Sequence, residues 1–193
     1  FNNPNYKNTE NSLYTKLSST SSDFLDENGY KTNVYEFSLG SDYEKYEDLT
    51  FYPTVKINYE QLETSSLASA NLKKQEGNYF ETAFLYSLDY DKRNQSFQPS
   101  DGFRSRFSQT LPLISNNYEI RNSYNFSKYN ELYNGMIGSF SFGLGAVNSV
   151  SGDDVRISKR IYIPERKLRG FEKGKIGPIE NSDYIGGNYS ATL

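Results

Sequence analysis

The chain of 193 residues contains no cysteine, no histidine and no tryptophan, and it has a single methionine. Without cysteine there is no disulfide, no thiol nucleophile and no iron–sulfur cluster. Without histidine there is no Ser-His-Asp or Cys-His catalytic arrangement and no histidine-bearing zinc site. Lysine and arginine number 21 against 24 aspartates and glutamates, a net charge of −3. That balance gives no electrostatic argument for binding nucleic acid.

Long apolar runs are also missing, because no stretch of about 18 apolar residues exists to form a transmembrane helix. Only 35% of the residues are hydrophobic and the mean hydropathy is −0.78, yet 16% are aromatic, with 18 Tyr and 13 Phe. Sheets with one aromatic face and one polar face reconcile these values. The sequence starts without Met or a signal peptide, so we expect an excerpt from a longer protein.

Alternation of apolar and polar residues with a period of two runs along most of the chain, and it predicts β-strands. Near residue 85, Phe84 and Tyr86 share one face, while Glu81 and Asp89 lie on the other. The same pattern predicts strands at residues 11–20, 31–40, 50–60, 79–91, 103–114, 118–129, 135–148 and 187–193. No segment shows convincing helical periodicity.

The predicted strands sort their side chains onto two faces. One face is expected to carry aromatic residues: Phe84, Tyr86, Phe107, Tyr124, Phe126, Phe140 and Phe142. The other face is expected to carry charged residues: Glu81, Arg104, Arg106, Glu119 and Arg121. A soluble antiparallel sandwich also predicts such alternation. The pattern of short turns and long polar loops, with tyrosines at strand ends, favours a transmembrane barrel over the sandwich.

The connections predict which segments share a rim of the barrel. Short turns are expected near Gly40-Ser41-Asp42, at Pro99–Gly102 and at Ser115–Asn117, all at one rim. The loops that hold Asn71, Asn130 and Arg169 are expected at the other rim. The longest connection, residues 148–186, exceeds an ordinary hairpin loop and is expected to fold back into the concave side of the sheet.

The long loop contains an ordered set of motifs. Leu168-Arg169-Gly170-Phe171 is followed by Ile176-Gly177-Pro178, and Gly186-Gly187-Asn188 then opens the next strand. This order resembles the sixth extracellular loop of the BamA family of outer-membrane assembly factors. The turn at Pro99-Ser100-Asp101-Gly102 resembles a short periplasmic turn of the same family. A lone Arg-Gly-Phe is weak evidence, whereas the ordered set is specific.

The resemblance implies an all-β fold, a transmembrane antiparallel β-barrel fragment with about eight of roughly sixteen strands and an inward-folding loop. It implies a protein of the bacterial outer membrane that folds and inserts other barrel proteins, is no enzyme, and needs no cofactor or metal. The implied partners are nascent outer-membrane proteins, periplasmic assembly lipoproteins and outer-membrane lipid. POTRA domains, a lateral gate and further strands are expected outside this chain. A two-partner secretion pore and a general porin remain alternatives.

The resemblance also implies a lumen-anchoring role for the loop motif, whose residues are Leu168, Arg169, Gly170, Phe171, Ile176, Gly177, Pro178, Gly186 and Gly187. Physical chemistry supports three of these assignments. The guanidinium of Arg169 suits a carboxylate cluster in a wet lumen, Gly170 permits a tight turn, and Phe171 is suited to packing on the inner wall. The nearest carboxylate partners are expected on strands beyond Leu193.

Two other groups of charged residues are weaker candidates. Arg104 and Arg106 form a basic stripe that is suited to an anion-selective pore, or that pairs with inward acids such as Glu81 and Glu119. The acidic pairs Asp26-Glu27, Glu47-Asp48 and Asp153-Asp154 lack the spacing of a calcium loop and are expected to be solvated.

Overall fold

The fold was analysed in a computed structural model that describes residues 1–168, 170–172, 174–181 and 183–193, with only the backbone of Glu165. Across these residues the chain forms one antiparallel sheet in the order β1-β2-β3-β4-β5-β6-β7-β8-β11. Its strands are β1 (Asn2–Asn3), β2 (Ser12–Phe24), β3 (Tyr30–Tyr46), β4 (Leu49–Thr64), β5 (Gly77–Asp91), β6 (Gly102–Ser115), β7 (Glu119–Tyr133), β8 (Met136–Ser149) and β11 (Tyr189–Thr192). Sequential pairing of neighbours is the topology of an up-and-down barrel.

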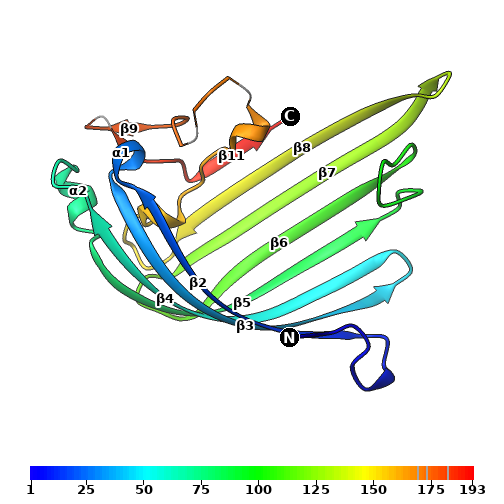
Figure 1. Cartoon of the computed structure of the whole chain (residues 1–193), viewed down its shortest axis with the longest axis horizontal. Coiled ribbons are helices and arrows are strands. Elements are labelled where there is room, and N and C mark those ends of the chain that lie inside the picture. Colours follow the sequence, from blue (N-terminus) through cyan, green and yellow to red (C-terminus); the bar gives the residue numbers. More distant parts are fainter. Residues whose placement is uncertain (169, 173, 182) are drawn as a thin grey trace.

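The sheet is a curved wall whose two edges do not meet (Figure 1). The segment between β8 and β11 returns over the concave side of this wall, where Figure 1 shows it in orange and red. It contains the 3₁₀ turns η2 (Ile157–Lys159) and η3 (Glu165–Lys167) and the hairpin of β9 (Ile179–Glu180) with β10 (Asp183–Tyr184). The expected all-β barrel fragment with an inward-folding loop is confirmed.

The convex face carries the aromatic residues that alternation assigned to it. Ring contacts join neighbouring strands across this face, as between Tyr86 and Phe107 at 6.2 Å and between Tyr124 and Phe142 at 5.7 Å. Apolar side chains on this face remain exposed, among them Phe37, Leu39, Val55, Ile57, Phe140 and Leu144. A soluble sandwich buries such a face against a second sheet, and the described residues provide no such sheet.

The concave face carries the charged residues, as predicted. Glu81 and Glu119 are buried there beneath the β8–β11 loop, and Arg104 pairs with Asp89 on the neighbouring strand. Polar side chains are thus buried while large apolar ones are exposed. This inversion is expected of a wall with lipid on one side and a polar lumen on the other.

The antiparallel order places connections at two rims. The loop rim holds the connections at residues 25–29, 65–76, 116–118 and 150–188, and the turn rim holds those at 47–48, 92–101 and 134–135. Pro99 and the long loop therefore lie at opposite rims, and Asn71 shares the loop rim, as predicted. Strict sorting by length was wrong, because the short Ser115–Asn117 turn lies at the loop rim and Asn130 lies within β7, near the turn rim.

The predicted turn at Gly40-Ser41-Asp42 was also wrong. These residues lie within β3, which runs on to Tyr46, and the true turn is at Glu47 and Asp48. Gly40 serves close packing instead, because a Cβ there would overlap the ring of Tyr14, whose hydroxyl bonds Thr54 at 2.6 Å. A glycine inside a strand can mark such a close approach rather than a turn.

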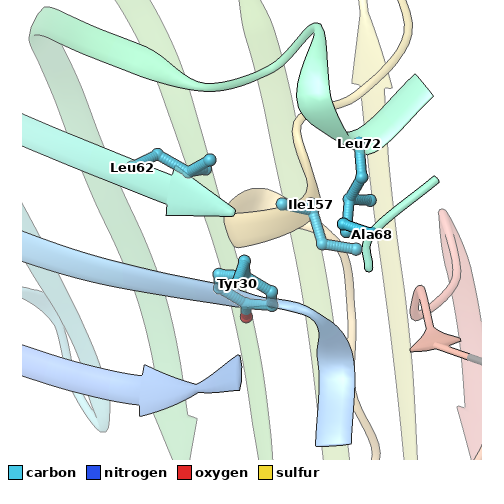
Figure 2. Close-up of a cluster of buried hydrophobic side chains, with 5 residues drawn as sticks. All are labelled: Tyr30, Leu62, Ala68, Leu72 and Ile157. Carbon is cyan, nitrogen blue, oxygen red and sulfur yellow. The ribbon is translucent and has the colours of Figure 1, made fainter. Parts of the chain in front are cut away.

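A small hydrophobic cluster closes the loop rim from the inside. Figure 2 shows its buried members, which come from four separate segments: Tyr30, Leu62, Ala68, Leu72 and Ile157. The short helix α2 (Ala70–Lys73) supplies Leu72, and its N-cap Ser69 accepts a hydrogen bond from the Leu72 N–H at 3.1 Å. Ile157 comes from the β8–β11 loop, so this loop packs into the rim with an apolar contact as well as polar ones.

Two further short elements complete the described chain. The helix α1 (Leu25–Asn28) links β2 to β3 and ends at Gly29 in a left-handed conformation, and η1 (Tyr6–Asn8) precedes β2. Among the residues that the structure describes, no helix has both the length and the apolar character needed to cross a membrane.

Candidate functional site

The β8–β11 loop is the candidate site, and its predicted motif residues are spread along its second half. Arg169 lies outside the described residues. Its neighbours Gly170 and Phe171 are exposed, and so is Leu168, with 56% of Phe171 open to solvent. The wall, as far as the structure describes it, therefore does not bury the ring of Phe171. Its anchoring role remains a prediction.

The glycine-rich end of the loop is firmly held. Gly186 is buried with a φ of 66°, and a Cβ at this position would lie 2.9 Å from the ring of Tyr162. Gly187 exchanges two backbone hydrogen bonds with Ile161, at 2.8 and 3.0 Å. These contacts fold the loop onto itself just before β11, and the positive φ and the nearby ring of Tyr162 give a physical reason for glycine at position 186.

The remaining motif residues form the turn that leads into the β9–β10 hairpin. Gly177 has a φ of 126°, a conformation that side chains rarely adopt, and Ile176 is half-buried. The carbonyl of Pro178 accepts a hydrogen bond from the Ile185 N–H at 3.0 Å. The Ile176-Gly177-Pro178 and Gly186-Gly187 motifs are thereby brought together, on either side of one small hairpin.

The most buried charge on the concave side is Arg156, at the start of the loop, and sequence reasoning did not identify it. Its side chain is only 2% exposed. The Arg156 backbone N–H donates to Glu119 Oε1 at 2.7 Å, and its Nη2 and Nε donate to Glu119 Oε2 at 3.0 and 3.3 Å. Nη1 donates to Glu60 Oε2 at 3.2 Å, and the guanidinium lies 4.2 Å from the centroid of the Tyr79 ring.

A second cation of the loop completes this ion cluster. Lys159 Nζ lies 2.5 Å from Glu81 Oε2, and the same oxygen is 3.9 Å from Arg156 Nη2. We call Arg156, Lys159, Glu60, Glu81 and Glu119 the stem cluster. Its three carboxylates come from β4, β5 and β7, so two loop cations bridge three strands of the wall. Three negative charges face two positive ones, and pairing is what makes burial of such groups tolerable.

Hydrogen bonds around the stem cluster extend the attachment. The Ile157 N–H donates to Gln75 Oε1 at 2.8 Å, and the Tyr79 hydroxyl donates to the Gln75 carbonyl at 2.6 Å. Arg160 pairs with Asp154 at 2.6 Å, so one member of the Asp153-Asp154 pair is engaged in a salt bridge within the loop. The first half of the loop is thus bonded to the sheet, to the α2 segment and to itself.

The far side of the loop contacts the α1 and α2 segments at the same rim. Asn28 Nδ2 donates to the carbonyls of Tyr184 at 2.7 Å and of Gly174 at 3.3 Å. Asn71 Nδ2 donates to Glu180 Oε1 at 3.0 Å. Three loops of the rim therefore contact one another and form one folded unit. They are centred on residues 28, 71 and 180.

Two titratable groups of the loop are shifted by this packing. Burial, followed by the negative charge of Glu180, raises the pKa of the Asp183 carboxyl above its usual value. Burial also raises the pKa of the Tyr162 phenol, with a smaller contribution from the neighbouring Tyr30. Both shifts disfavour the charged form, because burial in a low-dielectric environment is the largest cause of each.

The basic stripe of β6 lies nearer the turn rim and has different partners from those expected. Arg104 donates from Nε to Asp89 Oδ1 at 2.9 Å and from Nη2 to Asp89 Oδ2 at 2.5 Å. Arg106 lies 3.7 Å from the same carboxylate and stacks over Tyr52 at 5.2 Å. Glu81 and Glu119, the expected partners, instead bind the loop. Both arginines line a cavity of about 340 Å³ with Lys167.

The chain contains a signal that predicts the stem cluster. Glu60, Glu81 and Glu119 each lie on the inward face of a strand, within a few residues of its end at the loop rim. Three inward carboxylates at one level demand cations, and the loop that begins beside them carries Arg156 and Lys159. Pairing strands in register identifies this group, whereas reading each strand separately does not.

Comparison with known proteins identifies the family. The family description "Omp85 superfamily domain" matches residues 1–193, the whole chain. The chain belongs to the Omp85 superfamily. It is 25% identical over 186 residues to the "Outer membrane protein assembly factor BamA" of Neorickettsia risticii (strain Illinois), which covers 91% of this chain and 25% of that protein. It is also 25% identical over 126 residues to the human "Sorting and assembly machinery component 50 homolog", covering 64% of this chain and 27% of that protein.

The architecture agrees with this assignment. The fold is similar to the crystal structure of BamA from Haemophilus ducreyi lacking POTRA domains 1–3, with a TM-score of 0.82 and 20% identity. That similarity covers 98% of this chain and 42% of the solved chain. The chain therefore spans about a quarter of the length of the curated relatives that it matches. The predicted resemblance to BamA-type barrels and the outer-membrane location are confirmed.

Proposed function

We propose that this Omp85 chain is the central wall and inward loop of an outer-membrane protein assembly factor, which folds and inserts other β-barrel proteins. The observation that carries the proposal is the match to the Omp85 domain over the whole chain, together with a BamA relative aligned over 91% of it. A general porin is disfavoured by the family match. A two-partner secretion pore of the same superfamily is the remaining alternative.

The proposed mechanism uses the chemistry of strand edges. A weakly paired barrel seam offers unpaired N–H and C=O groups, and an incoming strand of a client protein adds to them by β-augmentation. The clients are nascent outer-membrane proteins, and periplasmic assembly lipoproteins are the proposed accessory partners. The protein is proposed not to be an enzyme, in keeping with a chain that lacks histidine and cysteine.

Within this proposal, the motif Leu168–Phe171 and the segments Ile176–Pro178 and Gly186–Gly187 anchor the loop in the lumen. Support comes from the folded state of the loop on the concave side, where Gly186 is buried and Gly187 is paired to Ile161. The partner of the motif arginine is proposed to lie on a strand that faces this wall. Gly170, at a φ of 94°, provides the turn beside it.

Complementation tests this function. The full-length gene is expressed in a strain whose own assembly factor is depleted, and growth and the levels of folded outer-membrane proteins are measured. An assembly factor restores both, whereas a dedicated secretion pore or a porin restores neither. Replacing Arg169 with Ala is expected to impair this restoration more than replacing Lys175 with Ala, because Lys175 is exposed and forms a surface ion pair with Glu172.

A further inference from the structure

The stem cluster is the strongest connection between the loop and the wall. Arg156 contributes its backbone N–H and three guanidinium contacts to glutamates, and its side chain is 2% exposed. The residues on either side, Val155 and Ile157, are 1% and 0% exposed. The start of the loop is therefore docked through both its backbone and its side chains, well before the Arg-Gly-Phe motif.

The geometry of the cluster spans several strands. Glu60 lies on β4, Glu81 on β5 and Glu119 on β7, and β6 lies between β5 and β7 in the sheet. One guanidinium reaches the first and third of these carboxylates by hydrogen bonds and approaches the second at 3.9 Å. A planar fork with five donors is suited to such multiple contacts, and an ammonium is not.

We propose that Arg156 is a positioning residue for assembly, which locks the stem of the β8–β11 loop onto the wall independently of the motif at the loop tip. Its functional consequence rests on the proposed assembly function. When the stem is held on the wall, only the short segment between the stem cluster and the tip determines where the tip lies over the lumen. Without this attachment, the whole loop would determine the position of the tip.

A single substitution of Arg156 removes its contacts and also changes the buried charge, so a second variant is needed to separate these two effects. Arg156→Met removes the lock and also leaves three buried glutamates with one lysine, which destabilises the barrel through charge repulsion. The combined variant Arg156→Met/Glu60→Gln/Glu119→Gln leaves only the neutral pair of Lys159 and Glu81. This triple variant removes the excess buried negative charge and retains none of the guanidinium contacts.

The absence of native cysteine in this segment allows a direct measurement of docking. A reporter cysteine replaces buried Val155 in the full-length protein in outer membranes, and its rate of reaction with a water-soluble maleimide is divided by the rate in unfolded protein. That ratio removes the effect that residues adjacent in sequence have on the intrinsic reactivity of the thiol. A cysteine at Val150, which is 60% exposed, is the matched accessible control.

The expected result is protection in the parent and loss of protection in both Arg156 variants, by about tenfold or more in relative rate. Heat-modifiable gel mobility reports barrel folding separately. The triple variant is expected to fold as the parent does while its reporter still reacts rapidly. Arg104→Met, which changes a guanidinium that pairs with Asp89 and Asp91 of β5, is expected to leave the reporter protected. Unchanged protection in a folded triple variant overturns the proposed lock.

The assembly readout tests the positioning role. The folded triple variant is expected to show a reduced level of newly assembled outer-membrane proteins in the depletion strain. If its reporter is labelled rapidly but assembly equals that of the parent, the lock exists and its positioning role is wrong. If the parent itself does not complement, the proposed function fails, whereas the labelling result still decides whether the lock exists.

Discussion

Two arginines on the same wall make similar bonds in different surroundings. Arg156 donates from Nε and Nη2 to one oxygen of Glu119, whereas Arg104 donates from the same two nitrogens to both oxygens of Asp89. The side chain of Arg156 is 2% exposed, whereas that of Arg104 is 34% exposed. The first ties a loop to three strands, and the second ties two neighbouring strands that backbone hydrogen bonds already join. Burial and redundancy distinguish the two pairs, as does the number of carboxylate oxygens that each guanidinium contacts within its pair.

The largest expected effect is the loss of Arg156. Its removal leaves three buried carboxylates opposite Lys159, and breaking a buried ion pair from one side costs about 3–5 kcal/mol. We expect Arg156→Met to lower the free energy of unfolding of the purified barrel in detergent by this amount, measured as a lower urea midpoint. A variant that unfolds at the same urea concentration as the parent would show that the cluster is not stabilising.

The second prediction extends the comparison to the two faces of one strand. Leu144 on β8 is 50% exposed on the convex face, in the middle of the strand. A lysine at the midplane of a lipid-facing surface costs about 2–4 kcal/mol. Leu144→Lys is therefore expected to reduce barrel stability in lipid vesicles. Ser139→Lys, at an exposed position on the concave face of β8, is the control and is expected to have little effect.

Sequence alone predicted the assignment of side chains to the two faces, because a period of two is a local property of each strand. It also predicted the inward-folding loop, whereas the anchoring role of the motif residues in that loop stays a prediction. It did not predict the turn after Tyr46, since the choice between a turn and a close approach at Gly40 depends on the ring of Tyr14, a strand away. Arg156 was missed because Glu60 and Glu119 lie 96 and 37 residues away in sequence.

The third prediction concerns Arg104, whose loss is expected to be milder. Arg106 Nη1 lies 3.7 Å from Asp89 Oδ2, so Arg106 can pair with Asp89 when Arg104 is removed. An ion pair with this degree of exposure contributes about 1 kcal/mol or less. In urea unfolding, Arg104→Met is expected to lower stability by no more than this amount. The double variant Arg104→Met/Arg106→Met is expected to lose more than the sum of the single changes, because Asp89 then has no cation.

The smallest effect is expected at Asp183, a carboxyl whose buried Oδ2 has no hydrogen-bond partner among the described residues. Its pKa is raised by burial and by Glu180, so the folded loop binds a proton more readily than the unfolded loop. Stability of the loop therefore falls as pH rises from the usual pKa of Asp through the raised one. Asp183→Asn is expected to remove this slope, measured by limited proteolysis of the loop between pH 3.5 and 7. An unchanged pH dependence in the variant would contradict the assignment.

The lengths of β3 and β4 have a consequence for where these contacts lie. These strands have 17 and 16 residues, whereas about 9–11 residues cross a bilayer. Their convex face is apolar from Tyr35 and Tyr59 toward the turn rim, and it becomes polar at Lys31, Asn33, Gln61 and Glu63 toward the loop rim. The polar ends of β3 and β4 therefore extend beyond the hydrocarbon layer, and we call these ends the collar. Glu60 and Glu119 lie where that collar begins, so the loop is attached to the wall beside the polar end of the strands, and its buried charges stay shielded from solvent although the apolar band ends there.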